Sequence, residues 1–272
     1  MTRNTSTASP TGAARAAQDS TAFRVLARIG YVVLGIVHIV IGGIAISIAT
    51  GGGGSADQGG AMAQIQQSPA GTFLLWSIVV GLTALAIWQI AEAFLERDPD
   101  TKKKWGHRVK FIGTAAAYLA IAGTALTSAL GGQSQSSESS QSLSAQLLAA
   151  PAGVALLVLV GLVIAGVGVA FVVRGITRAF EKHLSLPGGS VRTGIVAFGV
   201  AGYIAKGVAV AVTGILFVVA AVTHDPETAG GLDAGLRALA KLPFGTVILW
   251  TVGVGLALYG LFCFARARYA RM

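Results

Sequence analysis

Six long apolar segments constrain the fold of this chain more than any other feature of its sequence. Each is about as long as the roughly 20 residues that a helix needs to cross a hydrocarbon core of about 30 Å. Hydrophobic residues make up 54% of the chain and charged residues only 11%, whereas a soluble domain usually carries about 25% charged residues. We therefore predict an all-α integral membrane protein with six transmembrane helices. They lie at residues 29–49, 71–91, 111–130, 152–173, 194–222 and 244–265.

Residues 1–22 precede the first apolar segment and are rich in Thr, Ser and Ala, without an apolar period. We predict a disordered cytoplasmic tail there. It is not expected to be a cleavable signal peptide, because the apolar segment that follows is too long and begins after too many polar residues. The single cysteine, Cys263, excludes an intramolecular disulfide.

Basic residues are distributed unevenly between the two sides of the predicted membrane. Of the 20 Lys and Arg residues, Arg237 and Lys241 fall in a loop on one side and Lys206 falls within a span. The others fall on the opposite side with both termini, and the positive-inside rule places that side in the cytoplasm. This basic face suits anionic lipid headgroups, which contribute about 1 kcal/mol for each nearby Lys or Arg. We therefore expect membrane lipids as partners and no nucleic acid; the sequence identifies no protein partner.

The six spans form three repeats of two helices. The odd-numbered spans share a small residue before a tyrosine and a second small residue four places after it, a spacing that lets helix backbones approach closely. The even-numbered spans each follow a Pro-x-Gly motif, and we expect its proline in the first helical turn. The repeats are predicted at 23–97, 107–182 and 191–268, and are parallel because each returns to its starting side. The motifs are Gly30-Tyr31 with Gly35, Ala117-Tyr118 with Ala122 and Gly202-Tyr203 with Gly207, then Pro69, Pro151 and Pro243.

The outer loop of each repeat ends in a similar segment before its proline. The clearest, GLDAGLRALAKLPFG, places Leu232, Leu236 and Leu239 on one helical face. We expect a short amphipathic helix at the outer interface before each proline. The preceding stretches GGGGSADQGG and GGQSQSSESS are predicted to be flexible linkers from their composition.

The pattern resembles the domain of unknown function 1206 family, which consists of three tandem two-helix units in bacterial membrane proteins. The resemblance rests on the GYxxxG motif of the first and fifth spans, the Pro-x-Gly motifs, GLDAGLRALAKLPFG and the closing ARARYARM, over about residues 24–270. The middle repeat departs most, with Ala117 and Ala122 in place of both glycines. The resemblance implies a multi-pass protein of the bacterial cell membrane, and the family has no established activity.

Five polar residues in or near the spans are candidates for a site. Lys206 aligns with Leu34 of the first repeat, a depth from which its ammonium can snorkel to the headgroups. Glu92 is its natural ion-pair partner, although a charge within a span is also a candidate for binding a substrate or ion. His38, near the middle of the first span, either bonds a neighbouring hydroxyl or carbonyl or has a functional role. At one equivalent position, near the cytoplasmic end of the even-numbered spans, stand Glu92, Arg174 and Arg266.

The sequence offers no arrangement of residues for catalysis, cofactor binding or metal binding. Its serines are concentrated in the linkers, and no His/Glu pair has metal-ligand spacing. We therefore expect no enzyme activity and no cofactor. Two functions remain: a structural or accessory membrane protein acting through lipid or partner contacts, or a small channel or transporter with a path along the pseudo-threefold axis. They differ in whether the polar residues of the spans face a common cavity or face lipid and one another.

Overall fold

The computed structural model describes residues 21–95, 101–132 and 136–270, and these are almost entirely helical. The tail predicted at residues 1–22 lies almost wholly outside this part. Six of the helices are long and apolar enough to cross a membrane, as predicted. They are α2 (Thr21–Ala49), α4 (Gly71–Leu95), α5 (Thr101–Ala129), α7 (Gly153–Ile176), α8 (Gly189–Thr223) and α10 (Gly245–Tyr269). The shorter elements are α3 (Gln58–Gln66), α6 (Ser136–Ala149), η1 (Ala179–His183), η2 (Pro226–Thr228) and α9 (Gly231–Ala240).

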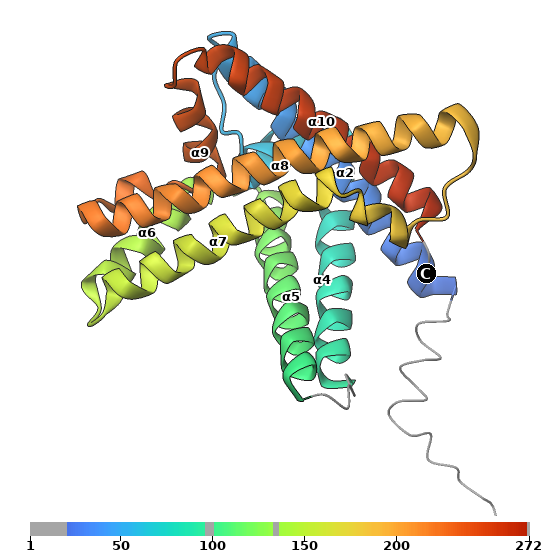
Figure 1. Ribbon diagram of the computed structural model, residues 1–272, viewed down its shortest axis with the longest axis horizontal. Helices are drawn as coiled ribbons and strands as arrows, with labels where there is room; N and C mark the ends of the chain where they lie inside the picture. The colour runs from blue at the N-terminus through green and yellow to red at the C-terminus, as the bar shows by residue number, and fades with distance from the viewer. Residues whose placement is uncertain (1–20, 96–100, 133–135, 271–272) are drawn as a thin grey trace, which may run out of the picture.

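The long helices pack in three antiparallel pairs, and each pair joins two different repeats. The second helix of one repeat lies against the first helix of the next, giving the pairs α4–α5 and α7–α8. The ring closes because α10, at the end of the third repeat, packs against α2, at the start of the first. Figure 1 shows α10 alongside α2, α7 alongside α8, and the α4–α5 pair running downward from the centre of the molecule.

Glycines set the spacing of two of these pairs. A β-carbon added at Gly207 of α8 would lie 2.6 Å from the carbonyl oxygen of Gly168 of α7. The contact is repeated between α2 and α10, where a β-carbon added at Gly35 would lie 2.8 Å from the carbonyl oxygen of Gly260. Gly35 and Gly207 are the second small residues of the tyrosine motif, so the motif makes the close helix packing that its spacing predicts.

The Pro-x-Gly motifs lie in tight turns, and the expectation that the proline enters the first helical turn is wrong. In the second repeat, Gly153 is the first helical residue, and its N–H donates to the carbonyl oxygen of Ala150 at 2.9 Å. Pro151 and Ala152 occupy the centre of this turn, and Ala152 adopts a left-handed conformation with φ of 60°. A β-carbon at Gly153 would collide with the carbonyl oxygen of Leu147. The glycine therefore lets each span begin directly against the short helix before it.

The short helices α3, α6 and α9 form, with the loop 51–57 and η2, a cap over the end of the bundle opposite the termini. Met62 of α3 and Leu236 of α9 are fully buried in the core that α2, α4 and α10 share. Figure 1 shows α9 beside one end of α10 and α6 along one end of the α7–α8 pair. A short helix precedes each proline, as predicted, and α9 is clearly amphipathic, whereas α3 and α6 are not. Both α3 and α9 enter the core and do not simply lie on the interface.

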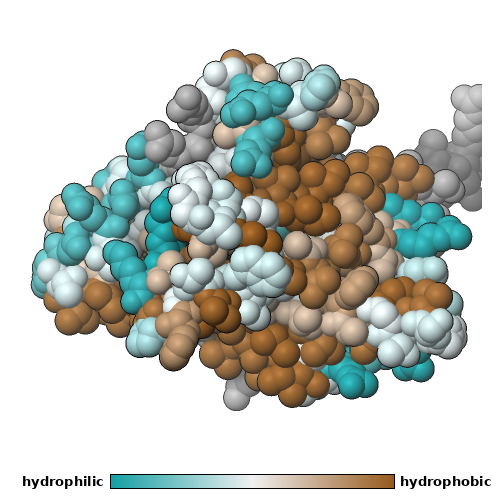
Figure 2. Space-filling model, turned by 90° about the horizontal axis from the view of Figure 1, so that it is seen from above, coloured by the Kyte–Doolittle hydropathy of each residue, from teal (hydrophilic) through white to brown (hydrophobic). Residues whose placement is uncertain are grey.

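Apolar side chains also cover much of the outside of the six long helices. Phe73 and Phe94 of α4 are 77% and 75% exposed, and Leu162 of α7 is 58% exposed. Figure 2 shows broad hydrophobic areas on one face of the molecule, with hydrophilic residues gathered toward its edges. Such a surface is stable in lipid and not in water. The protein is therefore a membrane protein with six spans, built from three parallel two-helix repeats.

Candidate functional site

The helix pairs bring four of the five predicted site residues together, in a cluster of cations and aromatic rings between α2, α7, α8 and α10. Lys206 lies midway along α8, partly buried, and its ammonium nitrogen stands over two aromatic rings. The nitrogen is 4.4 Å from the ring centre of Tyr259 on α10 and 5.1 Å from that of Phe171 on α7. A cation held over an aromatic face gains about 0.5–2 kcal/mol, the larger values applying where water is excluded.

His38 of α2 shares the Tyr259 ring with Lys206. Its imidazole lies 4.7 Å from the ring of Tyr259, centre to centre. The Nδ1 atom is 2.8 Å from the carbonyl oxygen of Leu34. Because a carbonyl oxygen can only accept, Nδ1 carries the proton, and Nε2 is the nitrogen left with a lone pair. The imidazole thus makes the bond to a neighbouring carbonyl that a packed histidine needs.

The two arginines of the aligned set each stand on the tyrosine of the next repeat. The guanidinium carbon of Arg266 lies 4.4 Å from the ring centre of Tyr31, and that of Arg174 lies 5.5 Å from the ring centre of Tyr203. Arg266 also donates to the hydroxyl oxygens of Tyr31 at 3.0 Å and Tyr203 at 3.5 Å. Tyr118, the tyrosine of the second repeat, is near enough to Arg266 to interact with it electrostatically.

The fifth candidate, Glu92, lies in α4, and its side chain is outside the described part of the structure. Its ion pair with Lys206 therefore stays a prediction. In the repeat alignment Glu92 takes the place of Arg174 and Arg266, so the pattern of the other two repeats predicts its carboxylate near Tyr118. The ring of three aligned positions would then carry two positive charges and one negative charge.

Buried aromatic side chains hold this cluster in place. Phe180 of η1 stacks on Tyr203 with ring centres 5.3 Å apart, and Phe262 of α10 meets the edge of Phe180 at 5.0 Å. All three are 2% exposed or less. Aromatic pairs of this kind add about 0.5–1.5 kcal/mol beyond the area they bury. The tyrosine of the third repeat is therefore a fixed part of the core, and it positions both arginines.

Positive charge predominates in the part of the cluster that the structure describes. The carboxylate–guanidinium ion pairs formed by the described residues, Arg192–Glu181 and Arg237–Asp233, do not include Lys206, Arg174 or Arg266. Within the same residues, Nε of Arg174 is buried and has no hydrogen-bond partner. No group of three potential metal ligands occurs among them either. The arrangement can attract an anionic group.

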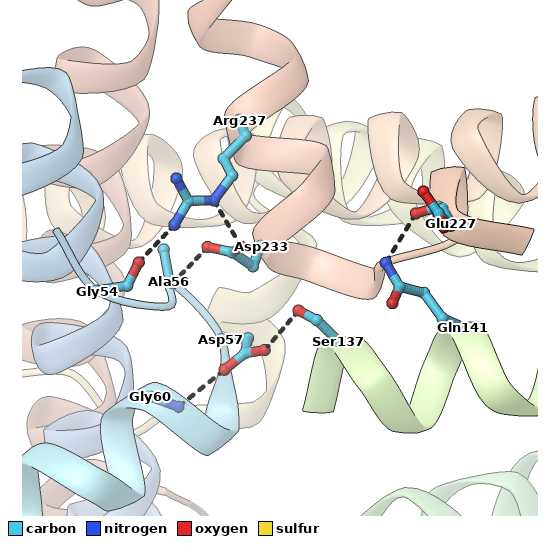
Figure 3. Close-up of polar contacts among 9 residues, drawn as sticks. All are labelled: Gly54, Ala56, Asp57, Gly60, Ser137, Gln141, Glu227, Asp233 and Arg237. Carbon is cyan, nitrogen blue, oxygen red and sulfur yellow. Dashed lines mark hydrogen bonds and ion pairs between the residues drawn. The ribbon is translucent and has the colours of Figure 1, made fainter. Parts of the chain in front are cut away.

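A second polar network, in the cap, was not predicted from the sequence. Asp233 of α9 accepts a hydrogen bond from the backbone N–H of Ala56 at 2.7 Å and forms an ion pair of 2.7 Å with Arg237. Arg237 donates to the carbonyl oxygen of Gly54 at 2.6 Å. Figure 3 shows these contacts joining the loop of the first repeat to the short helix of the third. Gly54 and Ala56 belong to a stretch predicted to be a flexible linker, and that prediction is wrong.

Asp57 continues the network toward the second repeat. Its carboxylate is 2% exposed, caps α3 by accepting from the N–H of Gly60 at 2.8 Å, and accepts from the hydroxyl of Ser137 at 3.1 Å. Burial, with a smaller contribution from Asp233, raises the pKa of Asp57 above its ordinary value of 3.8. Gln141 completes the circuit by donating to the carbonyl oxygen of Glu227 in the third repeat at 2.8 Å (Figure 3). The cap thus links all three repeats in a closed ring.

Comparison with known proteins supports the repeat architecture. The family model described as Domain of Unknown Function (DUF1206) matches three times in tandem, at residues 29–96, 109–178 and 201–270. The chain is also similar to the "Uncharacterized protein YxxB" of Bacillus subtilis (strain 168), with 32% identity over 158 residues. That match covers 57% of this chain and 57% of its relative. No solved structure matches the chain. With three matches that cover most of its length, the chain belongs to the DUF1206 family.

Proposed function

We propose that this protein is an accessory membrane protein that acts through contacts with lipids and partner proteins, and not an enzyme or a conduit. The observation that carries this proposal is the packing of the cations within the spans. Lys206 and Arg174 stand on aromatic rings, and Arg266 joins the tyrosines of two repeats. Each is used to hold helices together.

The cap supports the same function. It closes the bundle at the end opposite the termini, through hydrogen bonds between three repeats that include the buried carboxylates of Asp57 and Asp233. Opening a path there would break the hydrogen bonds that join the repeats, at a net cost of about 0.5–1.5 kcal/mol for each bond. A closed, polar-linked end is expected of a rigid scaffold.

The orientation is part of the proposal: both termini and the basic loops lie in the cytoplasm of a bacterial cell. A Cys263→Ser background removes the native thiol, and Gly53 and Lys182 are exposed positions on opposite sides. Gly53→Cys should react with a membrane-impermeant maleimide in intact cells, and Lys182→Cys should react only after lysis. Labelling of the reverse set contradicts this orientation.

Flux through reconstituted protein tests the function itself. Liposomes containing the purified protein should pass small anions and cations no faster than protein-free liposomes, under a concentration gradient of either sign. Lys206→Leu should not change that result. A flux that depends on the protein and is abolished by Lys206→Leu would overturn the accessory role.

The gathering of polar groups favours one alternative, a small channel or transporter for an anion. Lys206, Arg174 and Arg266 meet near the tyrosines of the repeats, and Nε of Arg174 has no hydrogen-bond partner among the described residues. A substrate anion could provide that partner. The same liposomes, loaded with chloride or phosphate, distinguish the two functions.

A further inference from the structure

Two cavities lie end to end along one face of α8. The first has a volume of about 520 Å³, between α8 and α10. Its walls are apolar apart from one threonine hydroxyl and include Ala201, Ile204 and Val208 of α8 with Gly255 and Leu258 of α10. The volume is within the range of roughly 300–1,000 Å³ that is usual for small-molecule sites.

The second cavity, of about 660 Å³, continues from the first toward the end that carries the termini. It is lined by Thr193, Ala197 and Ala201 of α8 and by Arg178 and Glu181 beside η1. Ala201 belongs to both cavities. Residues three or four apart lie on one helix face, so a single stripe of α8 lines both cavities. We call the two cavities together the groove along α8; its walls change from apolar to charged.

The groove is long enough for a lipid of one leaflet. Along α8 it extends from Arg192 to Val208, which is about 24 Å at 1.5 Å per residue. Half of a bilayer that is about 40–45 Å thick with its headgroup regions is close to this length. The charged part, next to η1, is then at the level of the headgroups.

The charged end carries a net positive charge. Arg178 and Arg192 line it together with a single carboxylate, Glu181, which forms an ion pair of 2.9 Å with Arg192. The side chain of Arg192 is still 59% exposed. Both arginines line this cavity, and guanidinium groups bind phosphate through paired hydrogen bonds.

Each repeat ends next to the start of another, which gives three equivalent junctions, and this pair of arginines occurs at one of them. The repeat alignment puts Glu96 and Ala270 at the position of Arg178, and Ser20 and His107 at the position of Arg192. The general basic character of this end of the molecule therefore does not account for the pair. It is specific to the junction of the second and third repeats.

We propose that the groove along α8 holds one anionic phospholipid, with its phosphate at Arg178 and Arg192 and an acyl chain between α8 and α10. The lipid comes from the leaflet on the basic side. The inference deepens the accessory role proposed above and rests on its lipid contacts, but it names a single site and one class of lipid.

Native mass spectrometry of the full chain tests the site. The delipidated protein is titrated in detergent with equal amounts of phosphatidylglycerol and phosphatidylcholine. We expect the first bound lipid to be phosphatidylglycerol, with at least about fivefold preference. The Arg178→Gln/Arg192→Gln variant should weaken that binding by about tenfold, the change expected from losing charge-assisted hydrogen bonds.

Two control variants separate the site from bulk charge and bulk apolar surface. Lys182→Gln/Arg268→Gln removes two exposed charges from the same end of the molecule, outside the groove, and should leave binding unchanged. Ala201→Phe fills the junction of the two cavities and should also weaken binding, whereas Ile215→Phe changes an exposed apolar position of α8 and should not.

Equal binding of the two lipids, or an equal loss in the charge-control variant, would overturn the proposal. The arginine substitutions are at exposed positions and should leave folding intact, so the test does not depend on the Ala201 variant. If the lipid site does not exist, the liposome flux is still expected to match that of protein-free liposomes. The mass spectrometry therefore tests the lipid site, and the flux tests the accessory role.

Discussion

The α7–α8 and α4–α5 pairs occupy equivalent places in the ring and are built from different residues. In α7–α8, Gly168 and Gly207 bring the two backbones into direct contact. In α4–α5, the equivalent positions are Ala86 and Ala122, both almost fully buried. Each of the two positions in the second pair thus carries one methyl group that the first pair lacks. The repeat therefore builds the same register with either glycine or alanine as the small residue.

The remaining glycines of α4 and α5 have a different role from those of α7 and α8. A β-carbon added at Gly81 or Gly113 would have no neighbour within 4 Å, whereas one added at Gly161 or Gly214 would meet the opposite helix. The same residue type thus packs helices in one pair and faces open space in the other. Counting glycines does not distinguish the two pairs, but their neighbours do.

The largest expected effect comes from adding bulk to these glycines. Gly214→Val should destabilise the protein by about 3 kcal/mol, because overpacking forces α7 and α8 apart. Gly113→Val should change the free energy of unfolding by no more than about 0.5 kcal/mol, as at an ordinary surface site. Thermal unfolding in detergent, followed by intrinsic fluorescence, measures both. Similar losses in the two variants would remove the distinction between the pairs.

The next effect concerns the cap, which adds a polar link where the glycine-packed α2–α10 pair already joins the third repeat to the first. Asp233→Ala removes the acceptor of the Ala56 N–H and leaves Arg237 without its ion pair. We expect a loss of about 1–3 kcal/mol, discounted for the partial exposure of Arg237. Asp225→Ala, which removes an exposed cap of η2, should cost about 1 kcal/mol or less. Equal losses would mean that the cap does not link the repeats energetically.

The spans and repeats could be predicted because their signals are local. Apolar length identifies a span, and a Pro-x-Gly turn marks the start of every second one. The pairing across repeats is a property of the ring: a repeat of two helices suggests a hairpin, yet α10 finds its partner in α2. The cap is equally hidden, since Asp57 lies in a Gly-rich stretch and bonds Ser137, eighty residues away.

The candidate site shows the same division. Lys206 and His38 were identified because a polar residue within an apolar segment is conspicuous. Their common partner, Tyr259, was not, because an aromatic residue in a span gives no such signal. In the repeat alignment Arg174 and Tyr203 are at positions that do not correspond to each other. Only the packing of one repeat against the next brings the two side chains into contact.

A smaller effect should appear as a pH dependence of stability at the junction of the first and second repeats, which the α4–α5 pair also joins. Burial raises the pKa of Asp57, so this group stabilises the fold when protonated, and its contribution is lost as the pH rises through the folded-state pKa. Asp57→Asn cannot ionise and should flatten that dependence. Unfolding curves of both proteins between pH 4 and 7 give the comparison. A wild-type stability that rises relative to the variant with increasing pH would contradict the sign.

The smallest effect is expected at Lys206. The equivalent position in the α4–α5 pair is occupied by Ile121. A charge at the centre of a span costs about 2.5–3.5 kcal/mol, and less near the interface. The rings of Tyr259 and Phe171 offset part of that cost, by about 0.5–2 kcal/mol. Lys206→Leu removes both terms and restores the residue found at Leu34, so stability should change by less than about 1 kcal/mol. A double-mutant cycle with Tyr259→Leu should give a coupling of about 0.5–2 kcal/mol, and zero coupling would exclude the aromatic contact. A second cycle, which combines Lys206→Leu with Glu92→Gln, tests the predicted ion pair. A coupling energy in this cycle would show that Glu92 of α4 interacts with Lys206 of α8.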